Sequence, residues 1–411
     1  MRFLEAYKCR VRTLTAAATI LLAITISPAG ARTRFQAGQP KAKTIDIPFK
    51  SHDGYPMFGR LTIPNTAGLH SVVIYVQTAE GMTVDMKRPK PGGGTFNYFD
   101  LYREKLPEMN VAFFSYEGRG VSMGDAPPRY EKIDWEIYNT STLDNKVRDL
   151  VSAVQVVQKQ TGIDTSQIFL MGASEGTLLC SEAASRVPKQ IKGLILYGVM
   201  SSNMRDTFKF IVTDGGFITY RGYFDTDNDG KISKAEFDAD PSGYRRQVWK
   251  DYTLENFDAD HDGFFTVADL KVLSKGLGDA ADTDNYEILN KWATTSGVVS
   301  TPKDWFKDHF AHPAIWTFLS KLDIPVGCFQ GLEDPFASAE GVKRMEEQAK
   351  KAGKSNMHFY YFEHLEHSLG ILRYFVKGTL PDGHKKIFEF IDDQVKSRRR
   401  GPADRISREP V

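Results

Sequence analysis

Short apolar runs alternate with longer amphipathic stretches along most of the chain. The runs, bounded by turn residues, predict buried strands at about 44–49, 57–63, 71–76, 111–116, 168–172, 193–199, 324–330 and 357–362. Apolar positions at helical spacing predict helices at about 96–109, 143–161, from 174 onward, 337–352 and 385–397. This alternation predicts an α/β fold, a mostly parallel sheet with helices on both faces. The first two strands flank Asp53-Gly54, which is typical of a hairpin and adds antiparallel strands at one edge.

The region 201–310 breaks the alternation. It is polar, rich in aspartate and without clear strands, so we expect an inserted helical cap between two strands of the sheet. The body of the fold then comprises residues 44–200 and 311–397. The last residues, 398–411, are expected to form a disordered tail.

The first 31 residues have the pattern of a secretory signal peptide. A basic stretch precedes an uncharged run from Thr13 to Ser27, which is followed by Pro28 and an Ala-x-Ala site ending at Ala31. A membrane anchor is the alternative, but the run is shorter than the roughly 20 apolar residues that a bilayer requires. We expect cleavage after Ala31 and a secreted or periplasmic protein with no stable membrane span.

Composition narrows the class of protein. The 411 residues are 41% hydrophobic and 26% charged, which excludes collagen-like, coiled-coil and disordered chains. A net charge of +1 argues against nucleic acid as a partner, because phosphate binding needs a clustered cationic face. Cleavage would leave only Cys180 and Cys328, which make no disulfide framework. Both are expected to be buried small side chains, with a single bridge between them as the alternative.

A candidate nucleophile lies where a predicted strand meets a predicted helix. Residues 172–176 read Gly-Ala-Ser-Glu-Gly and match the G-x-S-x-G pattern of a nucleophile elbow. The small residues let strand and helix approach closely around a sharp turn, which places the serine oxygen above the helix N-terminus. Ser174 is therefore the candidate nucleophile. An inert serine in an ordinary glycine-rich turn is the alternative.

Two further segments, together with this motif, resemble α/β-hydrolases. Residues 51–64, SHDGYPMFGRLTIP, resemble the opening hairpin of dienelactone-hydrolase-like and serine-aminopeptidase-like members. Residues 116–124, YEGRGVSMG, resemble their Arg-Gly-x-Gly-x-Ser loop. The resemblance covers about 45–205 and 311–395 and indicates a superfamily rather than a substrate. It implies the α/β-hydrolase fold and a triad in the chain order serine, acid, histidine.

The acid and the base of such a triad have candidates at the expected places. Asp334 follows the strand at 324–330; Glu333 competes with it, and the resemblance to the family's G-x-x-D pattern favours Asp334. After the last core strand come His364 and His367, and the family's sequence context favours His367. Ser174 would attack an acyl carbonyl, His367 would take its proton, and Asp334 would fix the imidazole tautomer. The remaining seven histidines are expected at the surface or at strand ends.

An oxyanion hole needs two backbone N–H donors. Glu175 supplies one as the residue after the nucleophile. The second is expected from the loop after the strand 71–76, from Thr78 or Ala79. Residues 77–81 read QTAEG here rather than the common His-Gly motif, which leaves the donor open between these two residues.

The predicted cap contains a calcium-binding pattern. Residues 225–236 fit the EF-hand loop at every defining position: aspartates at positions 1, 3 and 5, glycine at 6, a backbone carbonyl at 7, serine at 9 and glutamate at 12. Apolar residues before, within and after the loop are typical of the packing between EF-hand helices. The predicted ligands are Asp225, Asp227, Asp229, Lys231 and Glu236.

A second loop of the same kind covers residues 258–269. Its predicted ligands are Asp258, Asp260, Asp262, Phe264 and Asp269. The aspartate at position 12 is shorter than glutamate, so weaker Ca²⁺ binding or more Mg²⁺ character is expected there. A solvated acidic loop is the alternative for both segments.

The sequence therefore predicts an exported serine hydrolase that cleaves small-molecule carboxylic esters through a Ser-His-Asp triad, with two Ca²⁺ ions in its cap and no organic cofactor. A serine peptidase or aminopeptidase with the same triad is one alternative. A calcium-dependent binding module on an inactive hydrolase scaffold is the other.

Overall fold

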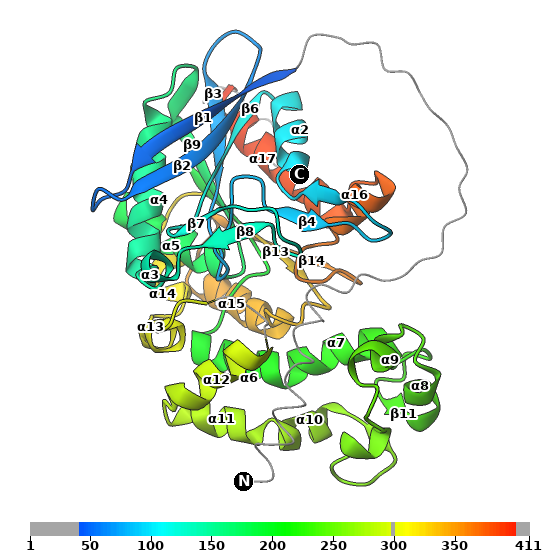
Figure 1. The fold of residues 1–411 in the computed structure, drawn as a ribbon. Helices are drawn as coiled ribbons and strands as arrows, with labels where there is room; N and C mark the ends of the chain where they lie inside the picture. Colours follow the sequence, from blue (N-terminus) through cyan, green and yellow to red (C-terminus); the bar gives the residue numbers. More distant parts are fainter. Residues whose placement is uncertain (1–40, 297–300, 400–411) are drawn as a thin grey trace, which may run out of the picture.

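The computed structural model describes residues 41–296 and 301–399. The predicted signal peptide and nearly all of the predicted tail lie outside the described residues. An eight-stranded sheet in the order β1-β2-β6-β3-β9-β10-β13-β14 forms the centre (Figure 1). The six strands from β6 to β14 are mutually parallel, and β2 pairs antiparallel with β1 and with β6. The predicted parallel sheet with an antiparallel hairpin at one edge is confirmed. The strands are β1 Ala42–Lys50, β2 Pro56–Pro64, β3 His70–Tyr75, β6 Val111–Tyr116, β9 Ile163–Ala173, β10 Gly193–Tyr197, β13 Val326–Gly331 and β14 Met357–Phe362.

Helices cover both faces of this sheet, and an apolar core lies under each layer. One core joins the sheet to α4, α5, α14 and α15, and the other joins it to α2 and α17. The central strands are apolar on both faces because both faces are covered. These helices and the short elements beside them are α2 Asp100–Glu108, α3 Trp135–Tyr138, α4 Leu143–Gln158, α5 Glu175–Arg186, α14 Trp316–Leu319, α15 Ala339–Lys351, α16 Leu372–Lys377 and α17 Asp382–Arg399.

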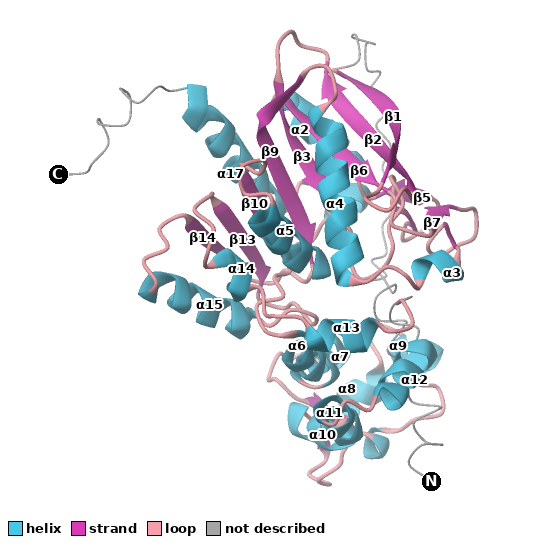
Figure 2. Ribbon diagram, turned by 90° about the vertical axis from the view of Figure 1, so that its left-hand side faces the viewer, coloured by secondary structure: helices cyan, strands magenta, loops and turns pink. Residues whose placement is uncertain are grey.

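Between β10 and β13 the chain leaves the sheet and forms a helical insertion. Figures 1 and 2 show it beyond the end of the sheet at which β9 and β13 finish. It has two apolar cores of its own, one around α6, α11, α12 and α13 and the other around the two acidic loops. Its elements are α6 Met204–Val212, α7 Asp214–Phe224, β11 Ile232–Ser233, α8 Lys234–Ala239, α9 Tyr244–Val248, the 3₁₀ helix η3 Leu254–Asn256, β12 Phe264–Phe265, α10 Val267–Leu273, α11 Lys275–Asp282, α12 Tyr286–Ser296 and α13 Trp305–Ala311.

Some details differ from the sequence-based expectations. The loop expected before residue 96 contains a small hairpin, β4 Lys87–Pro89 and β5 Thr95–Asn97, so α2 begins only at residue 100. Three consecutive glycines, 92–94, all with positive φ, make its turn. A second small hairpin pairs β7 Val121–Met123 with β8 Glu131–Ile133. The last helix continues to Arg399, two residues into the segment expected to be a tail.

Two further expectations can be compared with the described residues. Cys180 and Cys328 are both buried and free, so the single bridge does not form. No helix among residues 41–296 and 301–399 combines the length and the apolar character needed to cross a membrane.

Candidate functional site

Ser174 sits in the sharp turn between β9 and α5. Its backbone has φ 55° and ψ −130°, a region that non-glycine residues rarely adopt. A Cβ on Gly172 would lie 2.3 Å from the carbonyl oxygen of Gly176, so this turn requires glycine there. The Ser174 N–H donates to the carbonyl of Tyr197 at 3.2 Å, which fixes the turn against the end of β10. This is the strained strand–turn–helix geometry that the elbow pattern predicts.

Asp334 and His367, the predicted acid and base, meet beside this turn. The Nδ1 of His367 lies 2.9 Å and 2.8 Å from the two carboxylate oxygens of Asp334. Asp334 is buried and also accepts hydrogen bonds from the N–H groups of Phe336 and Ala337 and from Gln330 Nε2. A carboxylate held in this way makes Nδ1 the protonated nitrogen and leaves Nε2 as the base.

The environment of His367 tunes its basicity. Burial lowers the pKa of the ring, but the charge and hydrogen bond of Asp334, with a contribution from Glu366, outweigh burial and raise the pKa above its usual value. The side chain remains 21% exposed, so a substrate can reach it.

Gly198 brings His367 close to Ser174. A Cβ on Gly198 would lie 2.7 Å from both Cε1 and Nδ1 of His367, so the ring rests on the backbone at the end of β10. Strands β9 and β10 are neighbours with Ala173 opposite Tyr197, and neighbouring strands lie about 4.8 Å apart. Ser174 and the His367 ring therefore flank the same short stretch of backbone. No hydrogen bond joins Ser174 Oγ to His367 within the described residues, and such contacts often tighten only when substrate binds.

The competing candidates form a separate pair. His364 Nδ1 lies 2.9 Å from Glu333 Oε1, and the two side chains are 83% and 55% exposed. They lie at the surface, whereas Asp334 and His367 lie together beside Ser174. The geometry thus favours the predicted pair over its neighbours in sequence.

The predicted oxyanion segments lie against each other. The N–H of Glu175 belongs to the first turn of α5, and a Cβ on Gly176 would lie only 2.9 Å from the carbonyl oxygen of Gln77. Residues Thr78 and Ala79 follow directly. The loop after β3 thus lies against the start of α5, where a second N–H donor is predicted.

Beneath this site is a buried ionic cluster that sequence reasoning missed. The carboxylate of Glu175 contacts Lys146 Nζ at 2.5 Å, His309 Nε2 at 2.7 Å and Trp305 Nε1 at 3.0 Å. Burial raises the pKa of Glu175, but Lys146 and His309 outweigh burial and hold the pKa well below its usual range. The only signal in the sequence is a glutamate at a position that the elbow must bury, which requires a cationic partner.

The expectation that the other histidines lie at the surface or at strand ends is wrong for three of them. His309 is buried against Glu175, and His384 is buried against Tyr102. His312 is mostly buried and pairs with Glu182. Helix packing places these rings, and nothing in their local sequence reports it.

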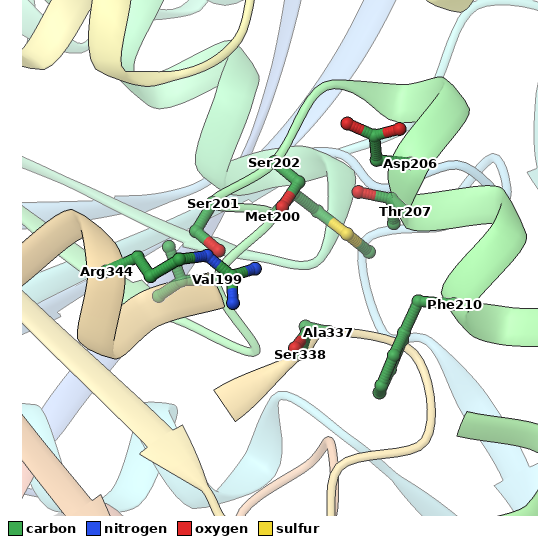
Figure 3. Close-up of a pocket in the computed structure, with 10 residues that line it drawn as sticks. All are labelled: Val199, Met200, Ser201, Ser202, Asp206, Thr207, Phe210, Ala337, Ser338 and Arg344. Atoms are coloured by element: carbon green, nitrogen blue, oxygen red, sulfur yellow. The ribbon is translucent and has the colours of Figure 1, made fainter. Parts of the chain in front are cut away.

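A pocket of about 210 Å³ opens next to the acid loop (Figure 3). It lies between the first helix of the insertion and the start of α15, and Figure 3 shows the Arg344 guanidinium pointing into it opposite Phe210. Three of its polar side chains form no hydrogen bond or ion pair within the described part of the chain: Ser201, Ser202 and Arg344. Its lining residues are Val199, Met200, Ser201, Ser202, Asp206, Thr207, Phe210, Ala337, Ser338 and Arg344.

In the first acidic loop, the predicted ligands converge. Carboxylate oxygens of Asp225, Asp227 and Asp229 lie within 4.8 Å of one another. Glu236 closes the loop: its two oxygens accept from the N–H groups of Thr226 at 2.8 Å and of residue 233 at 2.9 Å. The side chain of Asp225 is 1% exposed, and its Oδ1 has no hydrogen-bond partner among the described residues.

The second loop repeats this geometry. Asp258, Asp260 and Asp262 also bring oxygens within 4.8 Å of one another. Asp269, although shorter than glutamate, accepts from the N–H groups of Ala259 at 2.7 Å and of residue 266 at 2.8 Å. Strands β11 and β12 pair antiparallel and join the two loops. The carbonyls of Lys231 and Phe264 remain the predicted seventh-position ligands. The predicted apolar positions are buried in one core: Phe224, Ile232, Phe237, Phe257 and Phe265.

Comparison with known proteins returns only distant similarities. No protein-family model matches the sequence, and no curated protein matches it. Among solved structures, the chain is similar to a putative dipeptidyl aminopeptidase IV from Bacteroides ovatus, with 13% identity and a TM-score of 0.44 over 86% of this chain and 36% of that one. It is also similar to a hypothetical protein from Pseudomonas aeruginosa (14%, 0.47, 88% and 100%) and to a lipase in an open form (15%, 0.43, 86% and 99%). Similarities this low carry no functional information, so the chemistry of the site rests on its own residues.

Proposed function

We propose that the protein is a serine hydrolase that cleaves carboxylic esters through an acyl-enzyme on Ser174. The observation that carries the proposal is the contact of His367 with the buried Asp334, with the ring resting on Gly198 beside a serine in a strained strand–helix turn. A structural histidine would not need a buried carboxylate on one nitrogen and a partly exposed ring beside such a turn.

The reaction follows from these positions. His367 Nε2 accepts the Ser174 proton as Oγ bonds to the acyl carbon, and the carbonyl oxygen gains the negative charge. The N–H of Glu175 and an N–H from Thr78 or Ala79 stabilise that charge. The imidazolium then protonates the leaving alkoxide, and water activated by the same histidine releases the acid from Ser174.

Covalent labelling separates an enzyme from an inactive scaffold. We expect a fluorophosphonate probe to modify wild type but not Ser174→Ala, because only an activated serine reacts with it. A panel of p-nitrophenyl esters of varied acyl length and of aminoacyl amides then separates esterase from peptidase. A folded, calcium-loaded protein that takes no label would overturn the proposal and favour a binding module.

We further propose that the two acidic loops hold Ca²⁺. The donor set suits it: carboxylate and carbonyl oxygens lie at the EF-hand positions, and the buried Asp225 Oδ1 has no hydrogen-bond partner among residues 41–296 and 301–399. Asp225, Asp227, Asp229, Lys231 and Glu236 would hold one ion. Asp258, Asp260, Asp262, Phe264 and Asp269 would hold the other, and the shorter Asp269 supports a weaker second site.

A structural role for calcium is supported by helix α7. This helix ends at the first loop and begins beside the catalytic acid, where a Cβ on Gly215 would lie 2.1 Å from the carbonyl oxygen of Pro335. Its 11 residues span about 16 Å. An ion that orders the loop would therefore stiffen a helix that rests against the residue after Asp334.

Calorimetric titration tests the metal proposal. Glu236→Gln should weaken Ca²⁺ binding at one site by at least about tenfold, because it removes a charge and a bidentate ligand. Asp238→Asn is the matched control, since it removes an exposed carboxylate from the same helix without touching the loop. Chelation should lower the melting temperature. Unchanged melting and unchanged kinetics after chelation would rule out the structural role.

We also propose export, which rests on the sequence pattern of residues 1–31 alone. N-terminal sequencing of the mature protein should begin at Arg32. In an extracellular or periplasmic compartment the loops would meet abundant Ca²⁺, which fits permanent occupancy better than sensing.

A further inference from the structure

The residue after the nucleophile carries a carboxylate into the protein interior. Glu175 is 1% exposed, and its backbone N–H lies at the start of α5, where the oxyanion would bind. Removing a carboxylate from water is strongly unfavourable unless cations and donors surround it. The groups that hold this carboxylate therefore also fix the backbone to which it is attached.

Lys146, on α4, connects Glu175 to the other oxyanion segment. Its Nζ lies 2.5 Å from Glu175 Oε1 and donates to the carbonyl oxygen of Thr78 at 3.2 Å. The side chain is 5% exposed, so water competes little for these contacts. One ammonium group thus bridges the two backbone segments that supply the predicted N–H donors. Its position helps to set the distance between them.

The loop that carries Thr78 is also held on its other sides. Gln77 Oε1 accepts from the N–H of Met82 at 2.9 Å, and the N–H of Gly81 donates to the hydroxyl of Tyr138 at 3.1 Å. The cavity behind this loop has a volume of only about 10 Å³. That is room for at most one water molecule, so the loop has no space to retreat.

The second oxygen of Glu175 is held by α13, the last helix of the insertion. His309 Nε2 lies 2.7 Å from Oε2, and Trp305 Nε1 donates to the same oxygen at 3.0 Å. His309 Nδ1 faces the carbonyl oxygen of Trp305 at 2.8 Å. A carbonyl and a carboxylate are both acceptors, so each ring nitrogen of His309 faces a hydrogen-bond acceptor. The cap thereby places a second group, after Lys146, against the Glu175 carboxylate.

We infer that Lys146 and His309 are positioning residues of the oxyanion hole: they clamp the Glu175 carboxylate between them and, through it and Thr78, set the separation of the two N–H donors. The inference rests on the proposed acyl-transfer function. The donors must match the oxyanion of the transition state rather than the ground-state carbonyl, so loss of the clamp should lower kcat more than it raises KM. The cap then takes part in catalysis through Trp305 and His309, which lie 130 and 134 positions along the chain from Glu175.

The chain offers a matched control on the same two elements. Two turns further along α5, Glu182 Oε2 lies 2.7 Å from His312 Nε2, a contact of the same kind and length as that between His309 and Glu175. Glu182 bonds to Arg186 instead of reaching the oxyanion loop. Loss of this pair removes a similar anchor between α5 and the 305–312 segment and leaves the proposed clamp intact.

The experiment compares full-length His309→Gln, Lys146→Met and Lys146→Arg with His312→Gln. Steady-state kinetics use the best p-nitrophenyl ester, and inhibition by a trifluoromethyl ketone reports affinity for a tetrahedral oxyanion. We expect His309→Gln and Lys146→Met to lower kcat by about 10- to 100-fold, somewhat less than the loss of a whole donor, with little change in KM. Binding of the ketone should weaken by the same factor. Lys146→Arg should recover part of the loss, and His312→Gln should keep kcat near wild type.

Melting temperature and Ca²⁺ titration are recorded for each variant, so that changes in stability are separated from changes in rate. Equal kcat for folded His309→Gln and His312→Gln would overturn the inference and leave the proposed hydrolase intact. If Lys146→Met does not fold, the comparison of His309→Gln with His312→Gln decides alone. His309→Gln should fold because glutamine keeps a neutral hydrogen-bond donor at this position. A wild type that neither takes the fluorophosphonate label nor hydrolyses any ester would overturn the proposed function itself, and the inference with it.

Discussion

Replacement of Asp334 by asparagine tests the triad with the smallest change of shape. Every group around this carboxylate is a donor: the N–H groups of Phe336 and Ala337 at 2.8 and 2.9 Å, Gln330 Nε2 at 3.0 Å and His367 Nδ1 at 2.8 Å. An amide must turn its NH₂ toward some of them. If the NH₂ takes the Oδ2 position, it faces Gln330 and His367, and the imidazole is driven into the tautomer with hydrogen on Nε2.

That tautomer cannot accept the Ser174 proton. In serine proteases the corresponding change lowers kcat about 10⁴-fold, so we expect a loss of this order, equivalent to about 5.5 kcal/mol in the barrier. The unsatisfied donors should also cost about 1–3 kcal/mol of folding stability. The loss in rate is therefore larger than any loss of folded protein can explain.

The pH profile of ester hydrolysis provides an independent test of Asp334 as the acid of the triad. The base must be neutral, so activity rises with pH through the pKa of His367, and Asp334 holds that pKa above its usual value in wild type. In Asp334→Asn the charge is gone while burial, which lowers the pKa, remains. The midpoint of the residual activity should therefore move to lower pH.

Ester hydrolysis measured from pH 4 to 9 gives the loss in kcat and the shift of the pH midpoint. Thermal melts at each pH give the change in folding stability. Glu333→Gln is the matched control, because it removes the neighbouring carboxylate from an exposed pair with His364. Near-wild-type kcat in Asp334→Asn, or a larger loss in Glu333→Gln, would refute the assignment of the acid.

Three further changes have expected outcomes. Gly176→Ala would place a Cβ 2.9 Å from the carbonyl oxygen of Gln77 and displace an oxyanion segment, so kcat should fall by at least about tenfold. Gly222→Ala is the control, because a Cβ there enters open space and should leave the rate unchanged. Gly230→Ala strains a residue at φ +88° by about 1–2 kcal/mol and should weaken Ca²⁺ binding by about tenfold in calorimetry, which unchanged titration would contradict. Arg344→Ala should raise KM about tenfold for esters with a terminal carboxylate and not for uncharged ones; an equal effect on both substrate classes would remove this pocket from recognition.

Local sequence patterns were sufficient to predict features that depend only on residues close together in the chain. Apolar runs located the strands of the sheet, because strands buried on both faces must be apolar throughout. The elbow was visible because its turn tolerates only small residues at fixed spacing. The two acidic loops were visible because the positions of their predicted ligands lie within twelve consecutive residues. Boundaries were less certain, as at the start of α2, where a glycine turn forms an additional hairpin.

The candidate triad was predictable in part. Chain order and the family resemblance pointed to Asp334 and His367, but their neighbours Glu333 and His364 had the same chemistry. The family's sequence patterns favoured Asp334 and His367, and the structure adds a physical difference: Asp334 is buried against His367, whereas Glu333 and His364 are exposed. The contacts that hold Asp334, including that of Gln330, depend on how β10 and β13 lie side by side.

The sequence by itself determined the alternation that makes the α/β sheet, the strand–helix turn at Ser174 and the acidic loops, because each depends on residues close together in the chain. Tertiary structure alone decided which acid and histidine lie beside Ser174, and that Lys146 and His309 clamp Glu175. The clamp joins residues up to 134 positions apart, and its charged groups are tolerated in the interior because they lie against one another. Local patterns carry no information on which distant side chains share a desolvated site.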